Sequence, residues 1–188
     1  FAVCYERFGT KGLLFNGVNH LREINRSCYC ADAYEYPVSL FQLSDGRELL
    51  AHCPEDYNRI EIDDALTGER LTTCPQRKPC DFFHSRLAVS PTAKRILSAG
   101  WHWHPLDSVY CWDIAQALQE PTYLDECKGS RTYFENEIFP RDAVFLDDDR
   151  IALSLAPEPG FSEIQGLQTS LDVINVATNE TESSAPLT

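Results

Sequence analysis

The densest group of side chains that could do chemistry is the run Trp101-His102-Trp103-His104. In an extended segment alternate side chains project to the same side, so His102 and His104 would point together. Two imidazoles at this spacing can bind one metal ion when a third ligand completes the site. Three residues near the run in sequence could supply that ligand: His84, Asp107 or Cys111.

The same run has two other interpretations. Its histidines can face water while its tryptophans pack on a neighbouring loop, or its aromatic side chains can form a contact surface for a partner. Trp and Tyr dominate the hot spots of protein interfaces, whereas the metal site lacks a recognisable third ligand. We therefore expect binding residues rather than catalytic ones, with no metal and no cofactor: Trp101, His102, Trp103 and His104, together with Phe161 from a later loop.

The cysteines offer a weaker candidate for chemistry. Cys28-Tyr29-Cys30 and the pair Cys74 and Cys80 lack the two-residue gap that is usual between paired zinc ligands. A disulfide or free thiols are the alternatives to zinc. Cys53 and Cys111 fall in or beside predicted strands, where a thiol behaves as a small core residue, so we expect both to be unpaired.

Carboxylates are abundant, but none forms a recognisable catalytic pair. Asp147-Asp148-Asp149 resembles the start of a calcium loop, yet no Gly or bidentate Glu follows at the required offset, which favours a solvated turn. Four other carboxylates could in principle do acid–base work, and nothing in their spacing sets two of them apart: Asp56, Glu61, Asp63 and Asp64.

Short strands separated by turns must position the Trp-His run. Leu87–Val89 leads into the turn Ser90-Pro91-Thr92-Ala93, and Arg95–Ala99 follows with an apolar centre. A loop from Gly100 to Ser108 then leads to Val109–Ile114, which contains Trp112-Asp113. Short apolar segments between turn residues predict an antiparallel sheet. After it, Ile114–Gln119 has the pattern of a helical turn, and Pro121 to Leu124 suggests an outer strand.

The same order of strands occurs before and after this segment. Two predicted strands meet at the turn Ser44-Asp45-Gly46-Arg47, because Gly tolerates the positive φ of a tight turn. The repeats are spaced at roughly 40–50 residues with one longer insertion. The expected strands outside the central group are Val38–Leu43, Glu48–Cys53, Arg59–Asp64, Ala143–Leu146, Ile151–Ala156 and Leu171–Val176, with a possible outer strand at Leu66–Leu71.

The central segment resembles one blade of a WD-repeat β-propeller, in which a strand, a Ser-Pro turn, a second strand and a third strand with Trp-Asp follow one another. The resemblance covers Val38 to Glu180 and implies an all-β fold of antiparallel blades, about three of them recognisable, at 38–74, 82–127 and 141–180. Residues 1–37 would be N-terminal strands of a partial blade or closing segment, and 181–188 a polar tail. Because a propeller needs at least four blades, the resemblance implies part of a larger propeller.

The sequence departs from the family pattern in two ways. Only one repeat carries Trp-Asp, and none carries the Gly-His pair that often opens a WD repeat. The Asp-His-Ser-Trp hydrogen-bond set associated with those motifs is therefore not expected here. Two other architectures stay open: an antiparallel sandwich with evenly spaced strands, and a small four-bladed ring in which residues 1–37 pair with the C-terminal strand.

Composition and charge restrict the class of partner. The 188 residues include 29 acidic and 16 basic ones, giving a formal net charge of −13. A nucleic-acid-binding or anionic-membrane-binding surface normally has a basic excess, so we expect no nucleic acid and no membrane as partner. No segment approaches the ~18–20 apolar residues that span a bilayer. Eight cysteines are too few for a disulfide scaffold, and we expect mostly reduced thiols in a cytoplasmic protein.

The sequence therefore favours a non-catalytic β-propeller scaffold that binds a protein or peptide through loops on one face. The loops Gly100–Ser108 and Pro157–Ser170 would contribute the expected binding residues. Further blades from a longer chain are additional partners that the resemblance implies. The alternative is a propeller enzyme with a metal-dependent hydrolase or isomerase site at the central channel, which would need carboxylates or histidines from several blades to converge.

Overall fold

The computed structural model describes residues 1–103, 106–127, 138–157 and 169–187. Its strands are β1 (Ala2–Tyr5), β2 (Gly12–Asn16), β3 (Asn19–Glu23), β4 (Val38–Gln42), β5 (Glu48–His52), β6 (Glu61–Asp64), β7 (Leu87–Val89), β8 (Arg95–His102), β9 (Leu106–Asp113), β10 (Ile138–Phe145), β11 (Arg150–Pro157), β12 (Ser170–Asn175) and β13 (Glu180–Pro186). One short α-helix, α1 (Ile114–Gln119), precedes a 3₁₀ helix, η1 (Pro121–Asp125).

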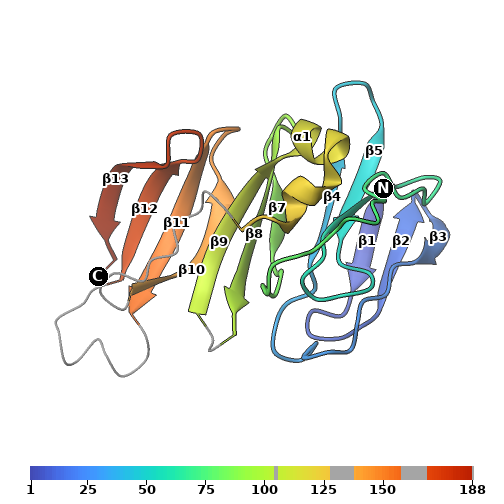
Figure 1. Ribbon diagram of the computed structural model, residues 1–188, viewed down its shortest axis with the longest axis horizontal. Helices are drawn as coiled ribbons and strands as arrows, with labels where there is room; N and C mark the ends of the chain where they lie inside the picture. The colour runs from blue at the N-terminus through green and yellow to red at the C-terminus, as the bar shows by residue number, and fades with distance from the viewer. Residues whose placement is uncertain (104–105, 128–137, 158–168, 188) are drawn as a thin grey trace.

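The strands form four separate antiparallel sheets, each ordered as in the chain: β1-β2-β3, β4-β5-β6, β7-β8-β9 and β10-β11-β12-β13. Figure 1 shows these sheets following one another along the long axis of the molecule, with the two termini far apart. The all-β, antiparallel part of the expected fold class is thus confirmed. Within the described ranges the sheets form an open series and close no ring.

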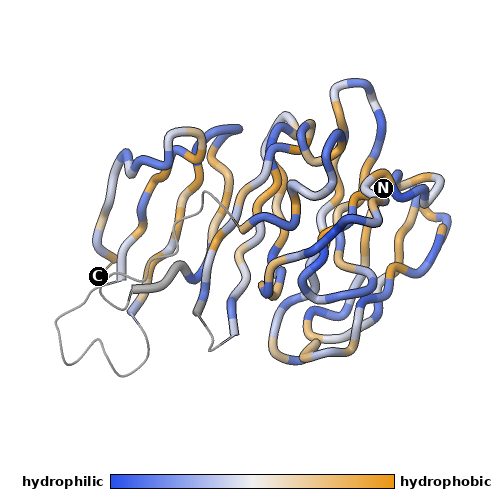
Figure 2. Tube along the Cα trace, viewed as in Figure 1, coloured by the Kyte–Doolittle hydropathy of each residue, from blue (hydrophilic) through white to orange (hydrophobic). Residues whose placement is uncertain are grey.

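Apolar side chains on both faces of the two middle sheets hold this series together. In β5, Leu49 packs in a cluster with the third sheet, while the next residue, Leu50, packs with Leu14 of the first sheet. In β8, Ile96 joins the cluster with the second sheet and Leu97 the cluster with the fourth. Because successive side chains of a strand point to opposite faces, each middle sheet packs against the sheet before it and the sheet after it. Figure 2 shows hydrophobic stretches along the strands and largely hydrophilic turns between them.

The tight turns of the middle sheets follow the chemistry of their residues. Gly46 has a φ of +88°, and the Asp45 carboxylate accepts a hydrogen bond from the Arg47 amide, closing the β4–β5 hairpin. In the β7–β8 turn, the Ser90 hydroxyl accepts from the amides of Lys94 and Arg95. These turns and the strands that they join agree with the sequence-based predictions to within a few residues.

The outer strands predicted after β6 and β9 are absent from the described residues. The Asp64 carboxylate accepts from the amides of Leu66 and Thr67, and only an isolated bridge from Asp63 to Arg70 continues the second sheet. After β9 the predicted helical turn is confirmed as α1, but η1 replaces the strand predicted at Pro121 to Leu124. Asp113 caps α1 by accepting from the Gln116 amide, and Pro121 suits the first turn of η1.

The predicted loop from Gly100 to Ser108 is instead a long hairpin. Strands β8 and β9 continue into it, so that Gly100 pairs with Ser108 and Trp101 pairs with Asp107. Aromatic residues favour strands, and Gly100 admits the close approach of another chain segment, which explains why pairing extends further than expected. Trp101 and His102 therefore lie on a strand, and Trp103 lies at the hairpin turn.

Both ends of the chain form strands. Residues 1–37 contain the three-stranded sheet β1-β2-β3, and in the described residues this sheet does not pair with the C-terminal strand. The expected polar tail forms strand β13, whose Thr181 pairs with Ile174 of β12. Its Thr181, Ser183 and Ser184 side chains are exposed, which makes it look like a tail in sequence although its backbone pairs with β12.

The cysteines are largely free thiols, with one exception. Cys80 and Cys127 form a disulfide across 47 residues, which corrects the expectation for these two positions. Cys53 and Cys111 are unpaired, as predicted; Cys53 is buried and Cys111 partly exposed. Burial raises the pKa of both thiols, that of Cys111 to about 12. No helix in the described part of the chain is long and apolar enough to cross a membrane.

Candidate functional site

Five aromatic rings from four chain segments meet at one end of the second and third sheets. We call this group the aromatic cluster: Tyr29, Tyr57, Phe83, Trp101 and Trp103. Tyr29 follows β3, Tyr57 lies between β5 and β6, and Phe83 precedes β7. The two tryptophans come from the β8–β9 hairpin.

Phe83 is the centre of the aromatic cluster. Its ring is fully buried and lies 4.0 Å from the Trp101 ring at an interplanar angle of 2°, and 4.1 Å from the Tyr57 ring at 22°. Trp103 and Tyr29 stack on the same ring at 5.6 and 5.9 Å. Offset stacking at these distances is a favourable arrangement for aromatic rings. The cluster is therefore a set of nearly parallel rings on a buried base.

Two members of the aromatic cluster present their rings to solvent. Trp103 and Tyr29 are each 49% exposed, whereas most large apolar residues of the middle sheets are buried. Of the residues expected to bind a partner, Trp103 is therefore accessible at the surface. Large exposed aromatic side chains on a rigid base are the usual components of interface hot spots.

Backbone contacts fix Phe83 against the hairpin. The Phe83 amide donates to the Trp101 carbonyl at 2.8 Å, and the Trp101 amide donates to the Phe83 carbonyl at 3.2 Å. Gly100 makes this approach possible, because a Cβ added there would lie 2.0 Å from the Phe83 carbonyl oxygen. Position 100 therefore requires glycine, because the hairpin and the segment that contains Phe83 lie too close together for a side chain there.

Carboxylates lie beside the aromatic cluster. The Tyr57 hydroxyl donates to the Asp81 carboxylate at 2.7 Å, and burial together with this hydrogen bond raises the pKa of Tyr57 to about 12. Asp56 precedes Tyr57 and also acts on its pKa. Both carboxylates are exposed, and within the described ranges neither forms an ion pair with a basic side chain. The edge of the cluster is therefore negatively charged.

The structure separates the residues that were candidates for a metal site. Both ring nitrogens of His102 are engaged, with the Asp81 carbonyl at 2.9 Å and the Tyr110 hydroxyl at 2.8 Å. Asp107 accepts from Arg141 at 2.6 Å. Across the described residues, no group of three or more His, Cys, Asp or Glu side chains is placed to hold a metal ion. His104 and Phe161 lie outside the described residues.

His84 is fully enclosed under the aromatic cluster. Its Nδ1 lies 3.2 Å from the Ser98 hydroxyl, and its ring meets the Trp112 ring edge-on at 5.6 Å. Burial lowers the pKa of His84 to about 3, so its imidazole is neutral at pH 7. His84 and Ser98 are therefore neighbours of Trp112 in the core, and the Trp112 indole donates to the Glu126 carbonyl rather than to Ser98.

Two groups of buried, hydrogen-bonded side chains join segments near the aromatic cluster. Arg77 donates to Asp125 at 2.6 Å and to the Ile60 carbonyl at 3.0 Å, with Glu61 nearby, which joins the second sheet to η1. His52 and Asp63 form a second buried pair at 2.9 Å. Burial raises the pKa of Asp63, but His52 and Arg70 lower it by more, so that it remains below its usual range.

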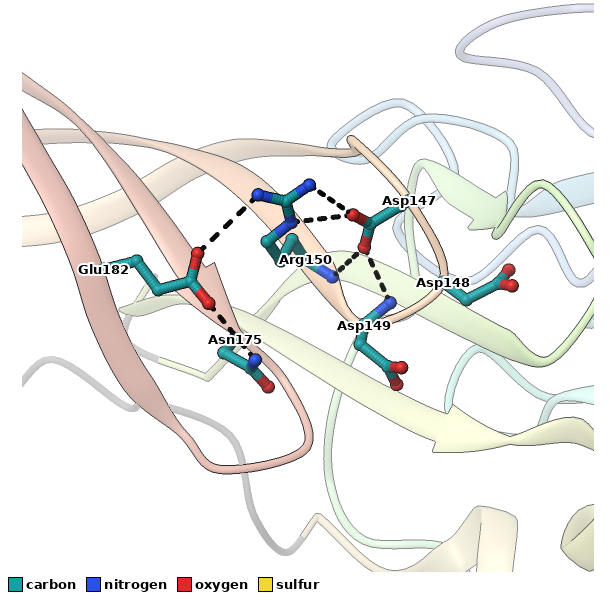
Figure 3. Close-up of a pocket in the computed structure, with 6 residues that line it drawn as sticks. All are labelled: Asp147, Asp148, Asp149, Arg150, Asn175 and Glu182. Atoms are coloured by element: carbon teal, nitrogen blue, oxygen red, sulfur yellow. Dashed lines mark hydrogen bonds and ion pairs between the residues drawn. The ribbon is translucent and has the colours of Figure 1, made fainter.

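An acidic hollow at the opposite ends of the strands is a structural feature. Figure 3 shows its lining, with Arg150 between Asp147 and Glu182. Asp149 binds Lys94 at 2.7 Å and Arg95 at 3.0 Å, and Asp148 accepts from the Thr92 amide at 3.0 Å. The three aspartates therefore form hydrogen bonds and ion pairs within their own turn and with the neighbouring sheet, in agreement with the prediction of a turn.

Sequence comparison finds no matching family model and no matching curated protein. Among solved structures, the chain is similar to one described as "Crystal structure of the eukaryotic initiation factor", with a TM-score of 0.50 and 14% sequence identity. The match covers 99% of this chain and 42% of that chain, so the present chain spans less than half of its neighbour. At this identity the likeness concerns the fold alone.

Proposed function

We propose that this protein is a non-catalytic binding module that holds a protein or peptide partner against the aromatic cluster. The observation that carries the proposal is the half-exposed pair of rings, Trp103 and Tyr29, stacked on the buried ring of Phe83. Because the buried base fixes the exposed rings, little side-chain entropy is lost when a partner covers them. Loops from three sheets supply the rings, so the site depends on the assembled fold.

The proposal includes the architecture suggested by the sequence: consecutive WD-repeat-like blades of a larger propeller, in which further sheets cover the outer faces of the first and last sheets. The sequential sheets with apolar side chains on both faces support it, as does the contact of His84 with Ser98 and Trp112. The outer face of the fourth sheet exposes three apolar residues, which another sheet would bury: Val144, Leu146 and Leu171.

The proposed compartment is the cytoplasm. Six cysteines are free thiols, and two of them, Cys4 and Cys28, are exposed. Exposed thiols persist in reducing compartments and become oxidised in the secretory pathway. The Cys80–Cys127 disulfide is the opposing observation, and alkylation of the native protein without reductant would reveal whether that pair is protected.

The experiment that tests the binding function is selection of peptides from a random phage-displayed library on the purified chain. Dissociation constants of the selected peptides are then measured for the wild type, Trp103→Ala and Phe8→Ala. Phe8 is also 49% exposed but follows β1 on the first sheet, which makes it a matched control. We expect Trp103→Ala to weaken binding at least roughly tenfold and Phe8→Ala to leave it unchanged. Peptides that bind all three proteins equally would overturn the proposal.

A further inference from the structure

We propose that the aromatic cluster and its carboxylates recognise an arginine side chain of the partner. This inference rests on the proposed binding function and specifies the chemical group that is bound. Trp103 and Tyr29 are each 49% exposed and each offers an aromatic ring to a guanidinium group, and the carboxylate of Asp81 lies at the edge of the same cluster, where it accepts from Tyr57. A guanidinium group stacks on aromatic rings and donates to a carboxylate in the same plane, which an ammonium group does less well.

The charges around the aromatic cluster favour a cation over an anion. Asp81 is held by the Tyr57 hydroxyl through one carboxylate oxygen, Oδ1, and Asp56 is adjacent in sequence to Tyr57. Both are exposed and, in the part of the chain that the structure describes, lack a basic partner of their own. The whole chain carries a formal net charge of −13, which attracts a basic segment from a distance.

The protein already uses this type of contact internally. The Arg26 guanidinium carbon lies 4.4 Å from the Tyr34 ring centroid and 5.0 Å from that of Tyr36. Tyr34 in turn contacts Phe83 edge-on at 5.4 Å, so an occupied guanidinium site lies directly beside the aromatic cluster. The exposed rings of Trp103 and Tyr29 have no cation over them among the described residues. A partner's arginine would stack on the exposed rings in the way that Arg26 stacks on Tyr34 and Tyr36 in the interior.

The test uses the peptides selected on the wild-type chain. Each arginine in them is replaced by citrulline, which has nearly the same shape without the charge, and in a second series by lysine. The protein is compared with Asp81→Asn, which retains an oxygen for the Tyr57 hydroxyl, and with Asp45→Asn as a control. Asp45 lies in the β4–β5 turn at the other end of β5 and pairs with Arg47.

We expect the selected peptides to contain arginine and to bind roughly tenfold more weakly after its replacement by citrulline. Asp81→Asn should cause a similar loss for the arginine peptide and little change for the citrulline peptide, and Asp45→Asn should have no effect. Lysine should restore only part of the affinity. Peptides that require Trp103 but bind equally with arginine, lysine or citrulline would overturn this inference and leave the binding function standing. Peptides that do not require Trp103 would overturn both.

Discussion

His84 is the side chain whose burial has the clearest consequence for stability. Its ring is enclosed by Phe82 and Trp112 and lies next to Ser98, and burial lowers its pKa to about 3. In the unfolded chain a histidine has a pKa of about 6.5, so the unfolded state takes up a proton over a range where the folded state does not. The contribution of His84 is therefore complete above about pH 6.5 and is lost as the pH falls toward 3.

This pH dependence can be measured by urea unfolding between pH 7 and pH 4. We expect the free energy of unfolding of the wild type to fall, with His84 contributing up to about 1.4 kcal/mol per pH unit below pH 6.5. His84→Gln retains a polar side chain opposite Ser98 and does not titrate, so its slope should be smaller by that amount. Identical slopes for the two proteins would show that His84 does not titrate on unfolding.

Individual residues also show the limits of prediction from sequence. Trp101 and Trp103 could be chosen because they are adjacent to histidines in one short run. Tyr29, Tyr57 and Phe83 could not, because they lie in separate loops and become neighbours only when three sheets pack together. From the sequence His84 is a candidate metal ligand only, because its role in the core depends on burial, which the sequence does not display.

The β8–β9 hairpin is the element on which the aromatic cluster depends. We expect Gly100→Ala to destabilise the protein by about 1–3 kcal/mol, because the added Cβ would lie against the Phe83 carbonyl oxygen. The opposite residue provides a control. Ser108 pairs with Gly100, and its buried hydroxyl has no hydrogen-bond partner among the described residues, so Ser108→Ala should be neutral or stabilising. Urea unfolding of both variants measures this difference, and equal stability of Gly100→Ala and the wild type would contradict it.

Strands were predicted more successfully than the elements between them. The nine strands of the last three sheets that were expected by alternation and turn chemistry are all present, since a Gly at positive φ such as Gly46 fixes a hairpin locally. The outer strand predicted at Pro121 to Leu124 was wrong because α1 and η1 bury Ile114, Ala117 and Leu124, whose contacts to the second and third sheets are not visible in a local pattern. The extent of the β8–β9 hairpin was missed because Trp101 also pairs with Phe83, a contact with a separate segment that a local pattern does not show.

In the molecule as a whole, the faces of the middle sheets are buried, whereas the outer face of the fourth sheet exposes apolar side chains. Apolar side chains cover both faces of the middle sheets, but the outer face of the fourth sheet carries Val144 and Leu171, 58% and 40% exposed, beside a shallow groove. We expect the isolated 188-residue chain to bind the dye ANS or self-associate through this face.

The double variant Val144→Glu/Leu171→Glu tests this expectation. Both positions are exposed, so the fold should be retained while dye fluorescence and self-association decrease. Val18→Glu is a suitable control because Val18, 95% exposed, lies in the β2–β3 turn away from this face. If dye binding and oligomeric state are the same in the wild type and the double variant, the outer face of the fourth sheet does not need to be buried by another sheet.

The most direct test of the central proposal is the NMR spectrum of the indole N–H groups of the ¹⁵N-labelled chain during titration with a selected peptide. The chain has three tryptophans: Trp101 and Trp103 in the aromatic cluster, and Trp112 in the core, where its indole donates to the Glu126 carbonyl. We expect the signals of Trp101 and Trp103 to shift as the peptide saturates the protein, while that of Trp112 stays in place. A saturating peptide that leaves the Trp103 signal unchanged would contradict the proposal that the aromatic cluster is the binding site.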